Sequence, residues 1–300
     1  MGEILQFKDL KTKEEFMEFF CVANAEENPR FLRHTNYYHY TKEEKFLCII
    51  KSKKLWLTSY AKREYDNDIT ESEWYKNYGQ NLFSICFTSG TSESLPFWYL
   101  YSGVQGKGVR LQFSRRSLKE LYNNGKYIIV YKTKESELLR KDQYTVVGGD
   151  ILYIDADEEN KEKCRAKYQN TNCFGINKTV VDALKEKDNY GAFIKDLIWS
   201  YEKETRIQVA IIDESIEPES VDHIELDISE VIKSMELRLG PEYDRESKEK
   251  LLERKEVNEW LSSKVEDSLY LGKIRMNLCN NCTYIQQKTD DKAHDREVLK

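Results

Sequence analysis

Proline, glycine and long apolar runs are all scarce in this chain of 300 residues. Only four prolines and thirteen glycines interrupt it, which excludes collagen-like, low-complexity and wholly disordered proteins. The sequence contains no apolar run of about eighteen residues, and its first residues have neither the basic start nor the apolar stretch of a secretory signal. We therefore expect a soluble, cytoplasmic protein that does not associate with a membrane.

A disulfide framework and an excess of positive charge are also missing. The seven cysteines, an odd number, are scattered along the chain, which favours reduced thiols. The 47 basic residues are outnumbered by 53 acidic ones, so we expect no non-specific binding to nucleic acid. Cys279 and Cys282 have the spacing of a zinc or redox pair, but a second pair is lacking, and we expect no metal site.

The sequence does contain enough apolar residues, 40% of the chain, to form a packed core. Apolar patterns predict strands near residues 36–40, 55–58, 82–87, 109–113, 127–131, 150–154 and 205–212. The last of these has the strongest strand pattern, and we expect it to be central. The order of strands and helices follows no strict β-α-β repeat, which indicates an α+β fold.

Helices are predicted where apolar residues recur at helical spacing. Two capping boxes, Thr12 with Glu15 and Thr41 with Glu44, predict the starts of the first two helices. The predicted helices cover residues 13–25, 41–54, 97–101, 115–122, 158–168, 178–185, a stretch ending near residue 198, and 229–263 with a break at Gly240-Pro241. Residues 61–80 are polar and aperiodic, and we expect them to form a loop that covers a site.

Polar side chains that could carry chemistry gather at three points where a predicted strand meets a loop. The three clusters are His39 with Tyr40, Thr88 with Ser89, and Glu202 with Glu204. A rigid sheet can hold such groups in one cleft, with aromatic neighbours as its walls. Each cluster also has a purely structural interpretation. His39 can be a structural histidine, Thr88 and Ser89 can form a turn, and Glu202 and Glu204 can belong to a surface ladder of charges that includes Arg206. The aromatic helix with Trp98 and Tyr101 fits either the core or a stacking wall.

Several segments, taken in order, resemble a known family. They are Tyr38-His39-Tyr40-Thr41, Ile85-Cys86-Phe87-Thr88-Ser89, Trp98 with Tyr101, Trp199-Ser200-Tyr201-Glu202-Lys203-Glu204-Thr205-Arg206, and Leu239-Gly240-Pro241. Over residues 36–241 this pattern resembles the bacterial domain-of-unknown-function family 2971. It is also similar, more remotely, to the ADP-ribosyltransferase fold of the diphtheria-toxin and poly-ADP-ribose polymerase type.

The resemblance implies a mixed or antiparallel split sheet with flanking helices. It implies an ADP-ribosyltransferase-like core with an N-terminal helix over residues 1–215. Residues 216–300 would then form a mainly helical C-terminal extension packed on that core.

The resemblance also implies a role for each residue of the three clusters. His39 would hydrogen-bond the ribose next to nicotinamide, Tyr40 and Thr41 would line the adenosine or amide side, and Thr88 with Ser89 would support the site. Trp98 or Tyr101 would stack on nicotinamide, and Glu202 or Glu204 would be the catalytic carboxylate. Arg206 is counted among the residues that would bind NAD, and it could pair with Glu204 under either interpretation. The chemistry agrees, because a carboxylate stabilises the positive charge that develops on the sugar and an aromatic face favours the cationic nicotinamide ring.

The function implied by the resemblance is cleavage of NAD, with NAD as substrate and ADP-ribose passing to a macromolecule or to water. A setting in toxin biology or phage defence would fit this chemistry. The alternative is a non-catalytic module that uses the same cleft to sense a nucleotide-like ligand or to bind a partner.

Overall fold

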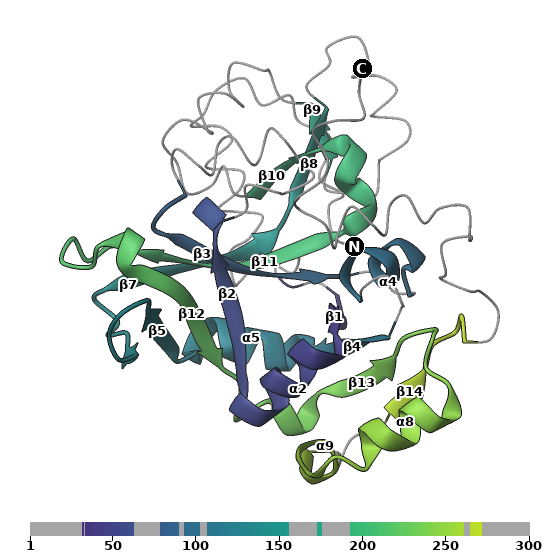
Figure 1. Cartoon of the computed structure of the whole chain (residues 1–300). Coiled ribbons are helices and arrows are strands. Elements are labelled where there is room, and N and C mark those ends of the chain that lie inside the picture. Colours follow the sequence, from purple (N-terminus) through teal and green to yellow (C-terminus); the bar gives the residue numbers. More distant parts are fainter. Residues whose placement is uncertain are drawn as a thin grey trace, which may run out of the picture.

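The structure, a computed structural model, describes residues 32, 34–62, 79–89, 93–102, 107–155, 173–175, 193–260 and 265–271 (Figure 1). In this part of the chain the fold is α+β, as predicted. The strands are β1 (Asn36–Lys42), β2 (Lys54–Ser59), β3 (Leu82–Thr88), β4 (Gly108–Ser114), β5 (Tyr127–Tyr131), β6 (Glu137–Leu138), β7 (Tyr144–Asp150), β8 (Leu152–Asp155), β9 (Cys173–Gly175), β10 (Ile194–Asp196), β11 (Glu204–Ile211), β12 (Val221–Asp227), β13 (Glu236–Leu239) and β14 (Val265–Asp267). The helices are α2 (Glu43–Ser52), α4 (Leu95–Tyr101), α5 (Arg115–Asn124), α8 (Arg245–Leu252) and α9 (Lys255–Trp260).

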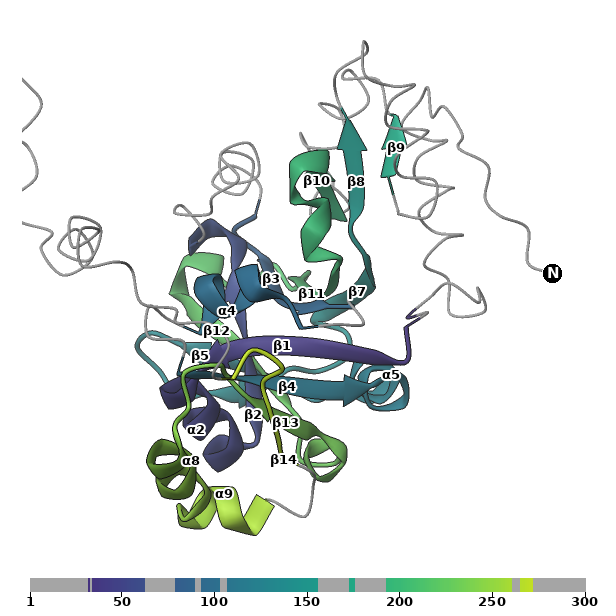
Figure 2. The ribbon, with the colours of Figure 1, turned by 90° about the vertical axis from the view of Figure 1, so that its right-hand side faces the viewer.

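Eleven strands form one open sheet of mixed direction. Its order is β14-β13-β4-β1-β3-β2-β12-β5-β6, and a branch leaves it where β11 pairs with β3 and β7 pairs with β11. The pairs in it are antiparallel except for β13 and β14, which run parallel. A second, parallel sheet of order β10-β8-β9 projects away from β1 and β4, as Figure 2 shows.

Strand β3 has two different neighbours on one of its edges. Along the other edge β11 pairs with it throughout, from Leu82 opposite Ala210 to Thr88 opposite Glu204. On the divided edge β1 meets β3 at Thr88, whereas β2 meets it at residues 83–84. Among the described strands none pairs with residues 85–87 on that edge, so the sheet opens there.

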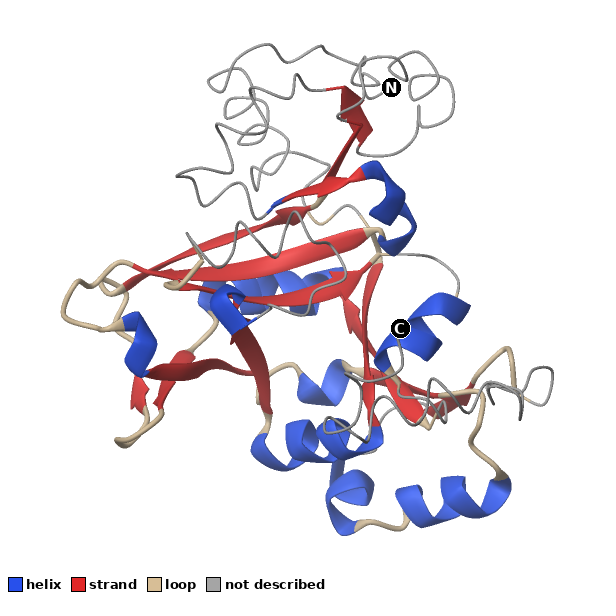
Figure 3. Ribbon diagram, turned by 45° about the horizontal axis from the view of Figure 1, so that its top comes forward, coloured by secondary structure: helices blue, strands red, loops and turns tan. Residues whose placement is uncertain are grey.

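The middle of the sheet has one apolar face and one partly polar face: Ile207, Val209 and Ile211 of β11 belong to the main core, while alternate residues of the same strand are buried polar side chains. All eight residues of β11 are buried, which confirms the prediction of a central strand at 205–212. Helices flank the strands, as the blue ribbons of Figure 3 show, and do not alternate with them along the chain. Helix α5 begins at the N-cap Ser114, whose side chain accepts a hydrogen bond from the Ser117 N–H, and it buries Leu118 and Leu121 against the sheet.

Two predictions near helix starts and ends were wrong. Thr41 belongs to β1, where it pairs with Val109 of β4, and Lys42 precedes α2 without a side-chain cap. Strand pairing therefore overrides the expected capping box. The helix expected to end near residue 198 is strand β10 followed by the 3-10 turn η4 (Leu197–Glu202).

Helix was also wrongly predicted over residues 229–239. This segment contains the 3-10 turn η6 (Ile232–Ser234) and strand β13, whose alternate residues Leu237 and Leu239 are buried. Because β13 pairs with β4 and β12 pairs with β2, residues 221–239 extend the sheet. Among the described residues after 215, α8 and α9 agree with the helical C-terminal extension that was expected.

Other predictions concern residues outside the described part of the chain. They are the helices at 13–25, 158–168 and 178–185, most of the covering loop at 61–80, and the Cys279–Cys282 pair.

A glycine at the start of β4 leaves no room for a side chain. A Cβ at Gly108 would lie 2.7 Å from the carbonyl oxygen of Thr41 and would overlap Ser102. We expect Gly108→Ala to lower the free energy of unfolding, measured by urea denaturation, by about 1–3 kcal/mol. Gly148→Ala is the control, because its Cβ would meet only the ring of Tyr122, which can turn away. An equal loss in both variants would contradict this account of Gly108.

Candidate functional site

A cavity of about 480 Å³ lies at the opening in the sheet, between β1, β2, β3 and the start of β11. This volume is typical of small-molecule sites. Seven of the ten residues predicted for the site line it, namely His39, Tyr40, Thr88, Tyr101, Glu202, Glu204 and Arg206. Segments that are distant in the sequence therefore meet around one space.

His39 is half-buried and has a fixed orientation. Its Nδ1 lies 3.1 Å from the carbonyl oxygen of Cys86, in the stretch of β3 that lacks a paired strand on this edge. A carbonyl oxygen can only accept, so Nδ1 donates the proton and Nε2 is an acceptor in the neutral ring. Burial lowers the pKa of His39, the bond to Cys86 raises it, and Lys45 lowers it again, with a net decrease. The ring is therefore neutral at pH 7.

Glu202 and Glu204 share one buried lysine. Nζ of Lys195 lies 2.7 Å from Oε2 of Glu202 and 3.1 Å from Oε2 of Glu204. Arg206 donates hydrogen bonds to both oxygens of the Glu204 carboxylate, with Nε 2.6 Å from Oε1 and Nη2 3.0 Å from Oε2. These four side chains are at most 7% exposed, so the interpretation as a surface ladder is wrong.

The end of β3 and Tyr153 hold the backbone that carries the two glutamates. Thr88 Oγ1 donates to the carbonyl of Glu202 at 2.7 Å, and both N and Oγ of Ser89 donate to the carbonyl of Lys203 at 2.9 Å. The N–H of Glu204 donates to the hydroxyl of Tyr153 at 2.8 Å. Lys203 between them has φ 46°, a left-handed conformation that non-glycine residues adopt rarely. The bonds on either side stabilise this bend.

Burial and charge move the pKa values of the two carboxyl groups in opposite directions. Burial raises the pKa of Glu202, and with Lys195 opposing and Glu204 reinforcing this effect the pKa reaches about 7. Burial also raises the pKa of Glu204, but Arg206 and Lys195 outweigh it and hold that pKa well below its usual range. At neutral pH Glu204 is therefore ionised, while Glu202 is close to its titration point.

Aromatic rings form another wall of the cavity. Tyr101 of α4 lines the cavity, is 43% exposed, and has its ring 5.2 Å from that of Phe97. Trp98, on the same helix, is fully buried and packs edge-on against Tyr40 at 4.8 Å. The position of Tyr101 suits stacking on a ligand, whereas Trp98 belongs to the core.

Three predicted site residues do not line the cavity. Thr41 is buried between β1 and β4, Ser89 lies just beyond β3 and bonds the backbone of Lys203, and Trp98 points into a small core with Tyr38. These residues contribute to the framework around the cavity.

Ten further lining residues were not among the predicted site residues, and they include Trp56, Lys62, Cys86 and Lys195. The sequence pattern placed Lys195 near the end of a helix, whereas it lies in strand β10. The available signal was its position between Phe193-Ile194 and Leu197-Ile198, because a lysine inside an apolar stretch favours a buried ion pair. The sequence around Trp56 gave no indication of a binding role, because a tryptophan on the exposed face of a strand is common.

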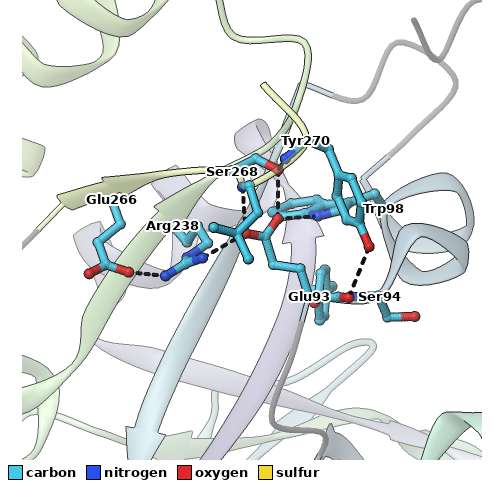
Figure 4. Close-up of polar contacts among 9 residues, drawn as sticks. Glu93, Ser94, Trp98, Arg238, Glu266, Ser268 and Tyr270 are labelled. Carbon is cyan, nitrogen blue, oxygen red and sulfur yellow. Dashed lines mark hydrogen bonds and ion pairs between the residues drawn. The ribbon is translucent and has the colours of Figure 1, made fainter. Parts of the chain in front are cut away.

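Helix α4 is anchored by the buried carboxylate of Glu93 (Figure 4). Its donors are Trp98 Nε1 at 3.0 Å, Arg238 Nη1 at 2.6 Å, Ser268 Oγ at 2.6 Å and the Leu269 N–H at 2.7 Å. Burial raises the pKa of Glu93, but these bonds together lower it below its usual value. Strand β13 and residues 268–269 thus fix the start of the helix that carries Tyr101.

The described ranges contain neither a metal-ligand cluster nor a membrane-spanning helix. No cluster of three or more histidine, cysteine, aspartate or glutamate side chains is placed to hold a metal ion in that part of the chain. Likewise, none of the helices described there is long and apolar enough to cross a membrane.

The fold and the site define an α+β protein with a polar, aromatic-walled cavity at an opening in its sheet. Residues 97–207 match the model of a family described as a protein of unknown function (DUF2971). This is the family that the sequence pattern resembles, matched over a shorter stretch that includes Tyr101, Lys195 and both glutamates, while His39 lies outside it. No curated protein and no solved structure matches the chain.

The anchoring of α4 can be tested by removing its carboxylate. We expect Glu93→Ala to lower the free energy of unfolding by about 3–5 kcal/mol, because it leaves several buried donors without an acceptor. Glu266→Ala is the matched control, since Glu266 also pairs with Arg238 but is 28% exposed. Urea denaturation of both variants measures the difference, and a Glu93→Ala loss no larger than that of Glu266→Ala would refute the anchor.

Proposed function

We propose that the cavity binds NAD and cleaves the bond between its nicotinamide and ribose, with ADP-ribose passing to a macromolecule or to water. The observation that carries the proposal is the meeting of His39, Tyr101, Glu202 and Glu204 in one cavity. A remote likeness to the ADP-ribosyltransferase fold, and a role in toxin biology or phage defence, belong to the same proposal.

The reaction needs a negative charge beside the sugar and a base. When the bond breaks, its electron pair moves to the ring nitrogen, so the pyridinium leaves as neutral nicotinamide. The ribose carbon becomes cationic and then bonds to water or to an acceptor nucleophile, which releases a proton. A carboxylate near that carbon stabilises the transition state more than the substrate.

The two glutamates suit these two tasks differently. Glu204 stays ionised because Arg206 and Lys195 hold its pKa low. Glu202 has a pKa raised to about 7 by burial, so it can take up a proton near neutral pH. We assign proton uptake to Glu202 and the fixed negative charge to Glu204.

His39 and Tyr101 supply the remaining contacts of the proposed complex. In the neutral ring of His39, Nε2 can accept a hydrogen bond from a ribose hydroxyl, because Nδ1 is already bound to the carbonyl of Cys86. The half-exposed ring of Tyr101 can stack on the nicotinamide, whose positive charge favours an aromatic face.

A non-catalytic module that binds a nucleotide-like ligand is the second candidate. Lys195 pairs with both carboxylates and Arg206 pairs with that of Glu204, and these cations offset much of the negative charge that a cationic sugar would feel. Binding without turnover is the property that distinguishes this candidate.

Release of nicotinamide tests the proposal directly. The purified protein is incubated with NAD labelled in its nicotinamide, and free nicotinamide is measured alongside Glu202→Gln, Glu204→Gln and His39→Ala. We expect release by the wild type and a loss of about 10²–10⁴-fold in Glu202→Gln, with circular dichroism confirming that the variant is folded. Tight binding of NAD without release would select the second candidate.

The pH dependence identifies the titrating group. Since Glu202 must be ionised to take up a proton, kcat/KM should rise with pH, with a midpoint near 7, and level off above it. Lys195→Met removes the cation that favours the ionised form, so the midpoint should move up by about 1–3 pH units. A midpoint that stays in place in a folded Lys195→Met protein would exclude Glu202 as the base.

A further inference from the structure

Trp56 presents an unusually large apolar surface to the cavity. This residue of β2 lines the cavity, yet its side chain is 57% exposed. A tryptophan at the wall of a polar cavity offers a broad flat face on which a planar ring can stack. Nothing in the proposed cleavage chemistry uses it.

The indole is backed by a second ring. His223 of β12 stacks on Trp56 with ring centroids 4.0 Å apart and an interplanar angle of 25°. The imidazole is itself held by Asp222, whose Oδ2 lies 2.8 Å from Nδ1. His223 therefore covers one face of the indole and fixes the orientation of the ring. The exposed area of Trp56 lies on the remainder of the indole. Such a preorganised surface loses little conformational freedom when a ligand stacks on it.

A cation lies next to this ring. Lys62 lines the same cavity, and its Nζ lies 2.6 Å from both Oδ1 and the backbone oxygen of Asp222. Asp222 thus holds both the lysine and the histidine behind Trp56. Both side chains of the Lys62–Asp222 pair are at least 40% exposed, and exposed pairs of this kind are weak. The ammonium group can therefore turn to a ligand anion at little cost.

Trp56 and the glutamates come from strands on opposite edges of β3. Strand β2 meets β3 at Thr58, opposite Ser84 and two residues beyond Trp56. Strand β11 pairs with the other edge and places Glu204 opposite Thr88. One cavity thus has two ring-binding walls, Tyr101 beside the glutamates and Trp56 beside Lys62.

We propose that Trp56 and Lys62 form a subsite for a purine nucleotide, with the base stacked on the indole and a phosphate on the ammonium group. This inference rests on the proposed function and deepens it, because NAD joins two ring-bearing nucleotides through a diphosphate. The adenosine half of NAD occupies the Trp56 subsite while the nicotinamide half reaches Glu202.

Binding of separate halves of the dinucleotide tests the subsite. Isothermal titration calorimetry measures the Kd values of NAD, AMP and nicotinamide mononucleotide for the wild type and Trp56→Ala. Loss of a stacked base should weaken NAD and AMP by about fivefold to 150-fold and leave nicotinamide mononucleotide unchanged. Trp56→Phe should retain most of the affinity, and Lys62→Ala should weaken AMP but not adenosine.

A matched control separates the subsite from general aromatic exposure. Tyr99 on α4 is 44% exposed but does not line the cavity, so Tyr99→Ala should leave every Kd unchanged. Equal weakening of NAD and nicotinamide mononucleotide by Trp56→Ala, or no weakening of either, would overturn the subsite. Binding of AMP that depends on Trp56, without binding or cleavage of NAD, would support the subsite while refuting the proposed function. Failure of the wild type to bind any of the three would overturn both.

Discussion

The gap along one edge of β3 decides where this protein can bind a small molecule. An unpaired stretch of strand exposes backbone groups that must find partners. Here the carbonyl of Cys86, between the contacts with β1 and β2, accepts a hydrogen bond from the side chain of His39. The opening in the sheet therefore holds the His39 side chain in a fixed tautomer, and the cavity lies around this side chain.

The opposite edge of β3 supplies the charged part of the site. Pairing with β11 brings Glu204 beside Thr88, and two buried cations, Lys195 and Arg206, keep the neighbouring carboxyl groups in the protein interior. Removing charges from water is unfavourable unless they are paired closely. A cluster of this kind is a weak source of stability, so its placement in a cavity wall favours a role in binding or chemistry.

Local patterns in the sequence predicted seven of the fourteen strands that the structure describes. The strand at Tyr127–Tyr131 has the bounds expected from its apolar residues, and the strand expected to be central, β11, is buried throughout. The three polar clusters were also identified: Thr88 and Glu204 lie at strand ends, whereas His39 lies in the middle of β1. Where tertiary pairing competes with a local signal, as at Thr41, the pairing prevailed.

The sequence by itself determined strands β1 to β5, β8 and β11, and the position of Glu202 and Glu204 at the start of β11. Only the tertiary structure decided that Lys195 lies between the two glutamates, that Trp98 is core while Tyr101 faces the cavity, and that Trp56 shares their space. Apart from the pairing of Lys195 with the two glutamates, seven and nine residues on, these contacts join residues far apart in the chain. Their proximity follows from the order and register of strands, which no local pattern encodes.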